Sequence, residues 1–104
     1  MVKITVLYPN KEGTRFDVPY YRDRHMKLVR ERLTPLGLRG TAIDKGLAGG
    51  APGQPPPYHC AGHLLFDSVE AFQKAFGKHA KEIMADIPNY TNAEPIIQIS
   101  EVVE

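Results

Sequence analysis

The amino-acid sequence predicts one α+β domain, a ferredoxin-like β-α-β-β-α-β sandwich with two helices on one face of a four-stranded antiparallel sheet. Three observations lead to this fold class. Four segments alternate apolar and polar residues as strands do, and two others carry apolar residues at helical spacing. Their order allows two right-handed crossovers on one sheet. The chain has 104 residues and a formal net charge of +1, which suits one hydrophobic core and not two.

The first half of the chain predicts a strand, a helix and a second strand. Residues 2–8 alternate and are rich in β-branched side chains, as in a half-buried strand. Asp17 suits the N-cap of a helix, whose single apolar stripe continues until Pro35 ends it. Residues 38–47 predict a second strand. It is weaker than the first because two of its residues, Gly40 and Gly46, are glycines.

A segment rich in glycine and proline follows the second strand. Seven of the ten residues at 48–57 are Gly or Pro, which excludes regular secondary structure. The flanking segments of about 47 residues each are too short to be stable independent domains. We therefore expect residues 48–57 to form a long loop within a hairpin, inside a single domain that spans residues 1–104.

The second half of the chain predicts a strand, a helix and a last strand. Residues 58–66 alternate, and either Asp67 or Ser68 can cap the helix that follows. We expect Gly77 to interrupt this helix, with a short helical turn after it. Residues 96–103 predict the final strand.

Apolar side chains are expected on both faces of the sheet. Leu7, Ala61, Leu65, Ile97 and Ile99 have the opposite parity to most apolar residues of the strands. A sheet with one face in water alternates cleanly to polar residues, and this one does not. Because the helices cover one face only, a second copy of the chain is the available cover for the other. The sequence thus predicts a homodimer with its sheets face to face; the alternative is a monomer with an exposed, mildly apolar sheet.

The composition narrows the class of partner and the compartment. The near-neutral charge gives no long-range attraction for nucleic acid or for an anionic membrane. No apolar run approaches the roughly 20 residues that cross a bilayer, and the first residues lack the basic region of a signal peptide. The single cysteine, Cys60, cannot form an intramolecular disulfide. We therefore expect a cytoplasmic protein with no nucleic-acid or membrane partner.

Three segments together resemble the EthD-like family, named for ethyl tert-butyl ether degradation. Residues 16–28 (FDVPYYRDRHMKL) hold a pair of tyrosines followed by a histidine, residues 66–72 begin the second helix, and residues 87–98 carry a C-terminal signature. The family belongs to the dimeric α+β barrel superfamily. The resemblance therefore implies a homodimer and a hydrophobic pocket between sheet and helices. Family members are linked to degradation of small apolar compounds beside an oxygenase system. Relatives in the superfamily act as monooxygenases, isomerases or dehydratases, often without a cofactor.

His25 and Tyr21 are the candidate catalytic residues. They are one helical turn apart, so the imidazole and the phenol share the apolar face, where His25 could act as general base or acid near neutral pH. Tyr21 could orient a substrate carbonyl or enol. Tyr20 points about 100° away, at the edge of the same site, and is a candidate substrate-binding residue. The alternative is a packing role for all three, with His25 bonded to a backbone carbonyl or to Tyr21.

Three further side chains are candidate substrate-binding residues. His63 lies in the third strand and could face the cavity between two sheets; its alternative is a hydrogen bond across the dimer or partial exposure. Tyr90 and Asn92 precede the last strand, in a segment that the resemblance places over the end of the barrel. An asparagine in a turn also commonly bonds its own backbone.

No metal or cofactor site is predicted. His59 and His63 are about 13 Å apart along an extended strand, whereas zinc ligands lie about 2 Å from the metal. Cys60 points to the other face of that strand and is expected to be a small buried residue. The chain has no recognisable motif for flavin, haem or nicotinamide binding.

The favoured hypothesis is an EthD-like protein that binds a small apolar or aromatic, partly oxygenated compound under the first helix. As an enzyme it would need no cofactor: His25 would move a proton while Tyr21 steadies the developing oxyanion. The resemblance suggests a degradation pathway with an oxygenase. The alternatives are a non-catalytic carrier or accessory protein of an oxygenase system, and a structural dimer with a filled core. For an enzyme we expect a cavity of about 300 Å³ or more that His25 or Tyr21 reaches.

Overall fold

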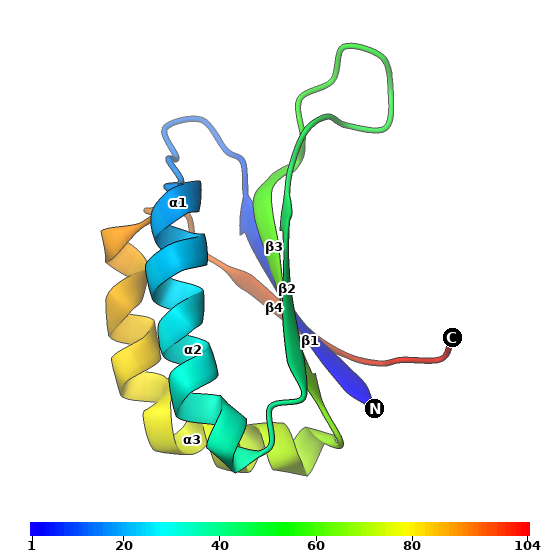
Figure 1. Ribbon diagram of the computed structural model, residues 1–104. Coiled ribbons are helices and arrows are strands. Elements are labelled where there is room, and N and C mark those ends of the chain that lie inside the picture. The colour runs from blue at the N-terminus through cyan, green and yellow to red at the C-terminus, as the bar shows by residue number, and fades with distance from the viewer.

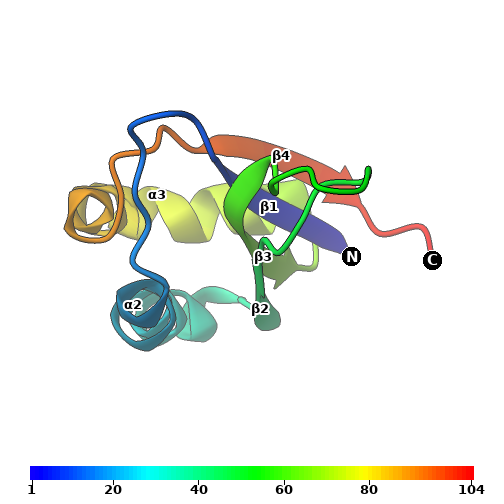
Figure 2. The same cartoon turned by 90° about the horizontal axis from the view of Figure 1, so that it is seen from above.

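The computed structural model describes residues 1–104 and confirms the predicted β-α-β-β-α-β order. Helices cover one face of a four-stranded antiparallel sheet, and the other face is bare in the single chain (Figures 1 and 2). None of the helices is long and apolar enough to cross a membrane. The strands lie in the order β2-β3-β1-β4 and are β1 (Val2–Pro9), β2 (Gly40–Lys45), β3 (Tyr58–Phe66) and β4 (Ile96–Glu101).

The first helical segment begins at the predicted cap. The Asp17 carboxylate accepts a hydrogen bond from the Tyr20 backbone N–H at 3.0 Å. Gly37 ends the segment in the left-handed conformation with φ of 113°, which suits glycine. The segment consists of α1 (Val18–Tyr20), a π turn η1 (Tyr21–His25), α2 (Met26–Leu33) and a 3₁₀ turn η2 (Thr34–Leu36).

The π turn η1 is a departure from the regular helix that the sequence predicts. The Met26 N–H bonds to the Tyr21 carbonyl, five residues back, instead of four. The wider turn lets His25 and Met26 both be buried, while the rings of Tyr21 and His25 stack at 5.6 Å. Single π turns are frequent at functional sites.

The second helical segment differs from the prediction at Gly77. Helix α3 (Val69–Asp86) is continuous, and the expected break at Gly77 was wrong. Gly77 is exposed, and an added Cβ would meet nothing, so the glycine costs the helix only its low helix propensity. The buried Phe72 and Ile83 pack on either side of it and hold the helix in place. Ser68 is the N-cap, accepting from a backbone N–H at 3.1 Å. The 3₁₀ turn η3 (Ile87–Asn89) follows.

The pairing of β4 with β1 shows that two residues were assigned to the wrong face of the sheet. Ile97 pairs with Val6, and Ile99 with Ile4, so both lie on the helix-covered face and not on the opposite one. The sequence alone does not show the register between these strands, which sets the faces. The bare face is therefore less apolar than expected. Its apolar residues include Leu7, Ala42, Ala61, Leu65 and Ile96, and its polar ones include Lys3, Thr5, His63, Gln98 and Ser100.

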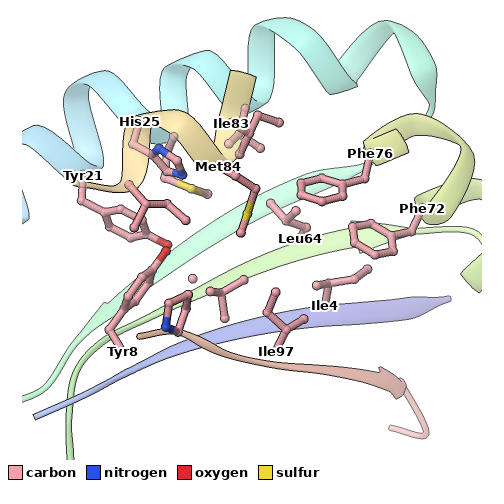
Figure 3. Close-up of a pocket in the computed structure, with 16 residues that line it drawn as sticks. Ile4, Tyr8, Tyr21, His25, Leu64, Phe72, Phe76, Ile83, Met84 and Ile97 are labelled. Carbon is pink, nitrogen blue, oxygen red and sulfur yellow. The ribbon is translucent and has the colours of Figure 1, made fainter. Parts of the chain in front are cut away.

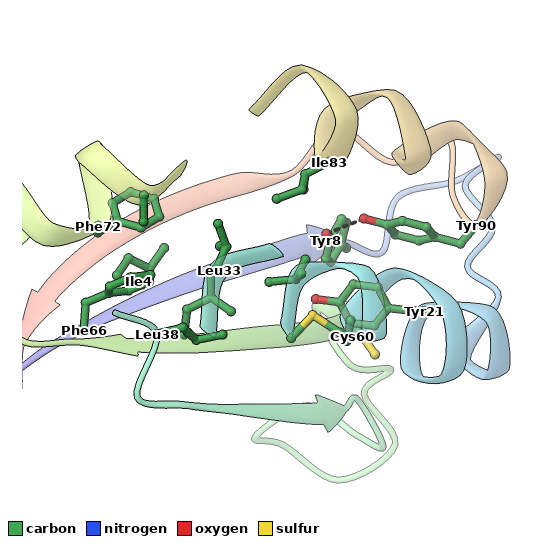
Figure 4. Packing of buried hydrophobic residues seen from close by; sticks show 14 of the residues in the cluster. Ile4, Tyr8, Tyr21, Leu33, Leu38, Cys60, Phe66, Phe72, Ile83 and Tyr90 are labelled. Atoms are coloured by element: carbon green, nitrogen blue, oxygen red, sulfur yellow. Dashed lines mark hydrogen bonds between the residues drawn. The ribbon is translucent and has the colours of Figure 1, made fainter. Parts of the chain in front are cut away.

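The hydrophobic core lies between the sheet and the helices (Figure 4). Ile4, Leu33 and Phe66 are almost completely buried at its centre. Tyrosines gather at one end of it, where the hydroxyls of Tyr8 and Tyr90 share a hydrogen bond of 2.7 Å. Residues 48–57 form the predicted loop within the β2–β3 hairpin and project away from the core (Figure 1).

Candidate functional site

A cavity of about 60 Å³ lies between the sheet and the two helical segments (Figure 3). Sixteen residues line it, and 13 of them are hydrophobic. The single chain therefore does not have the cavity of about 300 Å³ or more that we expected for an enzyme, and the space that it has suits a compact ligand. Met84 of α3 and Ile97 of β4 line it and are also 45% and 50% exposed. The cavity therefore meets the surface between α3 and β4.

The two ends of the cavity differ in polarity. At one end, the hydroxyls of Tyr8 and Tyr21 point toward each other, and His25 lies beside them (Figure 3). At the other end, Phe72 and Phe76 cover the sheet. No Lys, Arg, Asp or Glu lines the cavity. The arrangement suits a molecule with one oxygenated group and an apolar body.

His25 is held by a carboxylate that the sequence analysis missed. Its Nδ1 donates to Oδ2 of Asp86 at 2.9 Å, and Nε2 has no hydrogen-bond partner within the chain. The His25 side chain is only 5% exposed and lines the cavity. Burial lowers the pKa of His25, and the hydrogen bond to Asp86 opposes this only in part. His25 is therefore neutral near pH 7, as a general base must be before it accepts a proton.

Asp86 is fixed by three donors from different elements. Its Oδ1 accepts from the Tyr20 hydroxyl at 2.6 Å and from the Asn89 amide at 2.9 Å, and its Oδ2 accepts from His25. Burial alone would raise the pKa of Asp86, but the hydrogen bonds from Tyr20, Asn89 and His25 outweigh it and lower that pKa. The group is therefore a carboxylate at neutral pH, and a carboxylate can only accept hydrogen bonds.

Three phenols surround His25 at the polar end. Burial is the largest cause that raises the pKa of Tyr8, Tyr21 and Tyr90 far above the ordinary value for tyrosine, so all three are neutral. The Tyr90 ring packs against the His25 ring at 4.6 Å. The Tyr21 hydroxyl lies directly against the backbone of Gly62, where any Cβ would collide with it. The hydroxyls of Tyr8 and Tyr90 already bond each other and that of Tyr21 faces Tyr8, so a ligand oxygen at this end would compete with Tyr8 for the Tyr21 proton.

The structure places two of the six predicted site residues at the cavity. His25 and Tyr21 line it, while Tyr20 and Tyr90 pack around them without lining it. His63 lies on the bare face of the sheet, where its Nε2 donates to Asp44 at 2.7 Å. The Asn92 side chain bonds backbone groups of residues 13 and 15. Asn92 therefore fixes the loop before α1.

Tyr8 and Asp86 complete the site and were missing from the prediction. Tyr8 ends the alternating apolar stripe of β1, and this parity was a usable signal for its direction. Asp86 had no such signal, because it is 61 residues from His25 and only the packing of α3 beside η1 brings them together. No group of three or more His, Cys, Asp or Glu side chains converges to hold a metal ion.

Fold and site together define a small ferredoxin-like α+β sandwich with a mostly apolar cavity that is polar at one end. Residues 15–94 match the EthD domain, and the chain belongs to the EthD family. It is 46% identical to an EthD-like protein from Ralstonia eutropha JMP134, with a TM-score of 0.93, covering 99% of this chain and 92% of that one. No curated protein matches the chain.

More distant solved structures share the fold. An ethyl tert-butyl ether degradation family protein from Bacillus halodurans C-125 is 21% identical, with a TM-score of 0.68 and 99% of each chain covered. A dimeric ferredoxin-like protein from an uncultured marine organism is 15% identical, with a TM-score of 0.57, covering 100% of this chain and 96% of that one.

Proposed function

We propose that this EthD-family protein binds a compact, mostly apolar molecule with one oxygenated group, in the cavity between sheet and helices. The observation that carries the proposal is the unpaired Nε2 of His25 at the polar end of an otherwise apolar cavity. The His25 side chain is nearly buried, yet no fully buried polar side-chain atom of the chain lacks a partner, so Nε2 keeps enough exposure to bond water or a ligand that replaces it. The apolar residues at the other end provide the area for hydrophobic binding.

The site can also carry out proton transfer. Nε2 of His25 accepts a proton from an acidic O–H or C–H bond of the ligand and becomes an imidazolium, which the Asp86 carboxylate stabilises. The electron pair of the broken bond stays on the ligand as an oxyanion, and the Tyr21 hydroxyl donates a hydrogen bond to it. Return of the proton to another atom of the ligand restores His25. This sequence of steps needs no cofactor and gives an isomer of the ligand. In a dehydratase the proton would go instead to a hydroxyl of the ligand, whose C–O bond breaks as water leaves and the electron pair of the oxyanion forms the new double bond.

The second candidate function is that of a non-catalytic carrier or accessory protein. The volume of the cavity, about 60 Å³, favours it, because we expected about 300 Å³ or more for an enzyme. In either role the protein would serve a degradation pathway beside an oxygenase, as the EthD membership suggests. We place it in the cytoplasm, where its buried Cys60 would stay a free thiol.

We further propose that the working unit is a homodimer. The bare face of the sheet carries Leu7, Ala61, Leu65 and Ile96, which no element of the same chain covers. One structural relative is described as dimeric. A second copy would shield these residues and also surround the hydrogen-bonded pair of His63 and Asp44.

A thermal-shift screen with phenols, quinones and short aldehydes tests the binding proposal, since a ligand of the native state raises Tm by mass action. Two neighbouring isoleucines, each 50% exposed, provide matched variants. Ile97→Phe adds bulk inside the cavity, whereas Ile96→Phe adds the same bulk on the other face. We expect the ligand-induced shift to survive in Ile96→Phe and to vanish in Ile97→Phe. An unchanged shift in Ile97→Phe would refute the cavity as the binding site.

His25→Gln separates the enzyme from the carrier. Each compound that binds is incubated with the wild type and with this variant, and the products are analysed. An enzyme of the proposed kind converts the compound, and the variant still folds but loses at least about 100-fold of the rate, as expected for a lost general base. Recovery of the unchanged compound from the wild type would support the carrier instead.

A further inference from the structure

We propose that Asp86 fixes His25 in one tautomer, so that the cavity selects neutral ligands that donate a hydrogen bond: alcohols, phenols or enols. The inference rests on the proposed binding function and narrows its ligand class. It assigns Asp86 the role of a positioning residue, because its carboxylate acts on the ligand only through the imidazole ring.

The hydrogen bonds around Asp86 determine the tautomer. Oδ2 of Asp86 lies 2.9 Å from Nδ1 of His25, and a carboxylate oxygen can only accept, so the proton of the neutral ring is on Nδ1. Nε2 then carries a lone pair, and because the His25 ring lines the cavity, Nε2 is the acceptor that the ring can offer a ligand there. A ligand that offers only a carbonyl or ether oxygen would place two acceptors against each other and leave Nε2 unsatisfied.

The other lining groups disfavour anionic ligands. No cationic side chain lines the cavity to neutralise a carboxylate or phosphate, and the negative charge of Asp86 lies just behind His25. An anion would have to lose its water with only neutral phenols to compensate. A hydroxyl group avoids both problems, because it donates to Nε2 of His25 and accepts from a phenol such as Tyr21.

Direct measurement of the tautomer is the first test. ¹⁵N NMR of the wild type at pH 7.5 should show the proton of His25 on Nδ1 and a bare Nε2. In Asp86→Asn we expect the opposite tautomer, with the proton of His25 on Nε2. Oδ1 of residue 86 must still accept from Tyr20 and Asn89, so the new amide nitrogen takes the place of Oδ2 and donates to Nδ1 of His25. The ring proton then moves to Nε2. A wild-type ring protonated on Nε2 would overturn the inference.

Matched alcohols and ketones provide the second test. The pairs 2-propanol and acetone, cyclopentanol and cyclopentanone, and cyclohexanol and cyclohexanone differ only in whether the oxygen can donate. In NMR titrations of the wild type we expect the alcohol of the tightest-binding pair to bind about fivefold more tightly than the ketone, the ratio that one neutral hydrogen bond confers. Cyclohexanecarboxylate should bind more weakly than cyclohexanol.

Asp86→Asn links the two tests. With a proton on Nε2, the variant should bind ketone and alcohol within about twofold of each other. Asp67→Asn is the matched control, because it removes the same charge from a surface carboxylate that pairs with Arg39 and does not line the cavity. It should keep the wild-type preference. A preference that survives in Asp86→Asn would show that Asp86 does not set it.

The outcomes separate this inference from the proposed function. If ketones or the carboxylate bind the wild type as tightly as the alcohols, the ligand class is wrong while binding in the cavity stands. If none of these compounds, nor any in the thermal-shift screen, perturbs the signals of His25, the proposed binding function itself fails. The tautomer measurement needs no ligand and no variant, so it decides the role of Asp86 even if Asp86→Asn does not fold.

Discussion

The hydroxyl of Tyr21 occupies the space that a side chain at position 62 would fill, and the phenol can approach strand β3 this closely because residue 62 is glycine. This contact joins the π turn to the centre of the sheet. It also fixes one wall of the polar end of the cavity, since both residues line it. Gly62 is thus part of the site, although it contributes no functional group.

Gly62→Ala should therefore destabilise the fold and weaken ligand binding. The new methyl group would collide with the Tyr21 hydroxyl, which is buried and has little room to move, and overpacking of this kind costs about 1–3 kcal/mol. Urea denaturation measures the free energy of unfolding. Gly77→Ala is the control with the opposite sign: its methyl group meets nothing, and the helix should gain about 0.5–1 kcal/mol. Equal effects in the two variants would mean that Tyr21 can shift freely.

Stability should fall as the pH drops below about 6.5, through His25. The pKa of His25 is lowered in the folded state, so between its folded and unfolded values the unfolded chain binds more protons and unfolding becomes easier. In His25→Gln this part of the pH dependence should be absent. Denaturation midpoints at pH 8, 7, 6 and 5 measure it. A parallel pH profile in the variant would assign the effect to another group.

A second loss of stability is expected at lower pH, through Asp86. Its pKa is lowered in the folded state, so its contribution is complete above the unfolded value of about 3.9 and is lost as the pH falls through the folded value. Asp86→Asn should flatten the profile below about pH 4. The pKa of Asp67 is also lowered, but its carboxylate is exposed, so Asp67→Asn should change the pH profile of stability less.

The bare sheet face should mediate dimerisation. Ile96→Asp places a charge on this face, and sedimentation at micromolar concentration should change from twice the chain mass to the 11.6 kDa of one chain. Gln73→Asp puts the same charge on the exposed side of α3 and should leave the dimer intact. If the wild type itself sediments as a single chain, the homodimer proposal is wrong.

Replacement of residues 49–54 by a tight turn should leave the fold unchanged. This part of the loop bonds mainly to itself, as in the 2.9 Å bond from Gly49 to Gln54, and loop length has a small entropic cost. Pro56 and Pro57 are kept because Asn10 donates to the carbonyls of both. Tm and the sedimentation mass are the measurements. A loss of the dimer at unchanged Tm would indicate that the loop contacts the second copy.

Local patterns predicted the order of the elements, the helix start at Asp17 and the hairpin loop. These features depend on neighbouring residues, so capping and alternation were sufficient. The faces assigned to Ile97 and Ile99 were wrong because their direction depends on how β4 pairs with β1, over 90 residues of chain. The break at Gly77 was wrong because tertiary packing outweighed a weak local preference.

The site was predictable where one element forms it and not where two elements meet. His25 and Tyr21 come from a single turn, and their spacing showed that they share a face. Asp86 lies at the end of the other helical segment, and its pairing with His25 depends on how the helices pack. His63 was expected to face a cavity between sheets, and it does lie on the face where a second copy would pack.

The π turn at Tyr21–His25 holds one residue more than a regular α-helical turn. The extra residue is taken up within the turn, so Tyr21 lies against β3 while Met26, Val29 and Leu33 keep their places in the core. Removal of one residue from the exposed Arg22–Arg24 stretch would turn the bond from Met26 to Tyr21 into an ordinary α-helical one and leave both residues on their present faces. The length of the chain can thus change at this surface turn without moving the ligand site or the core.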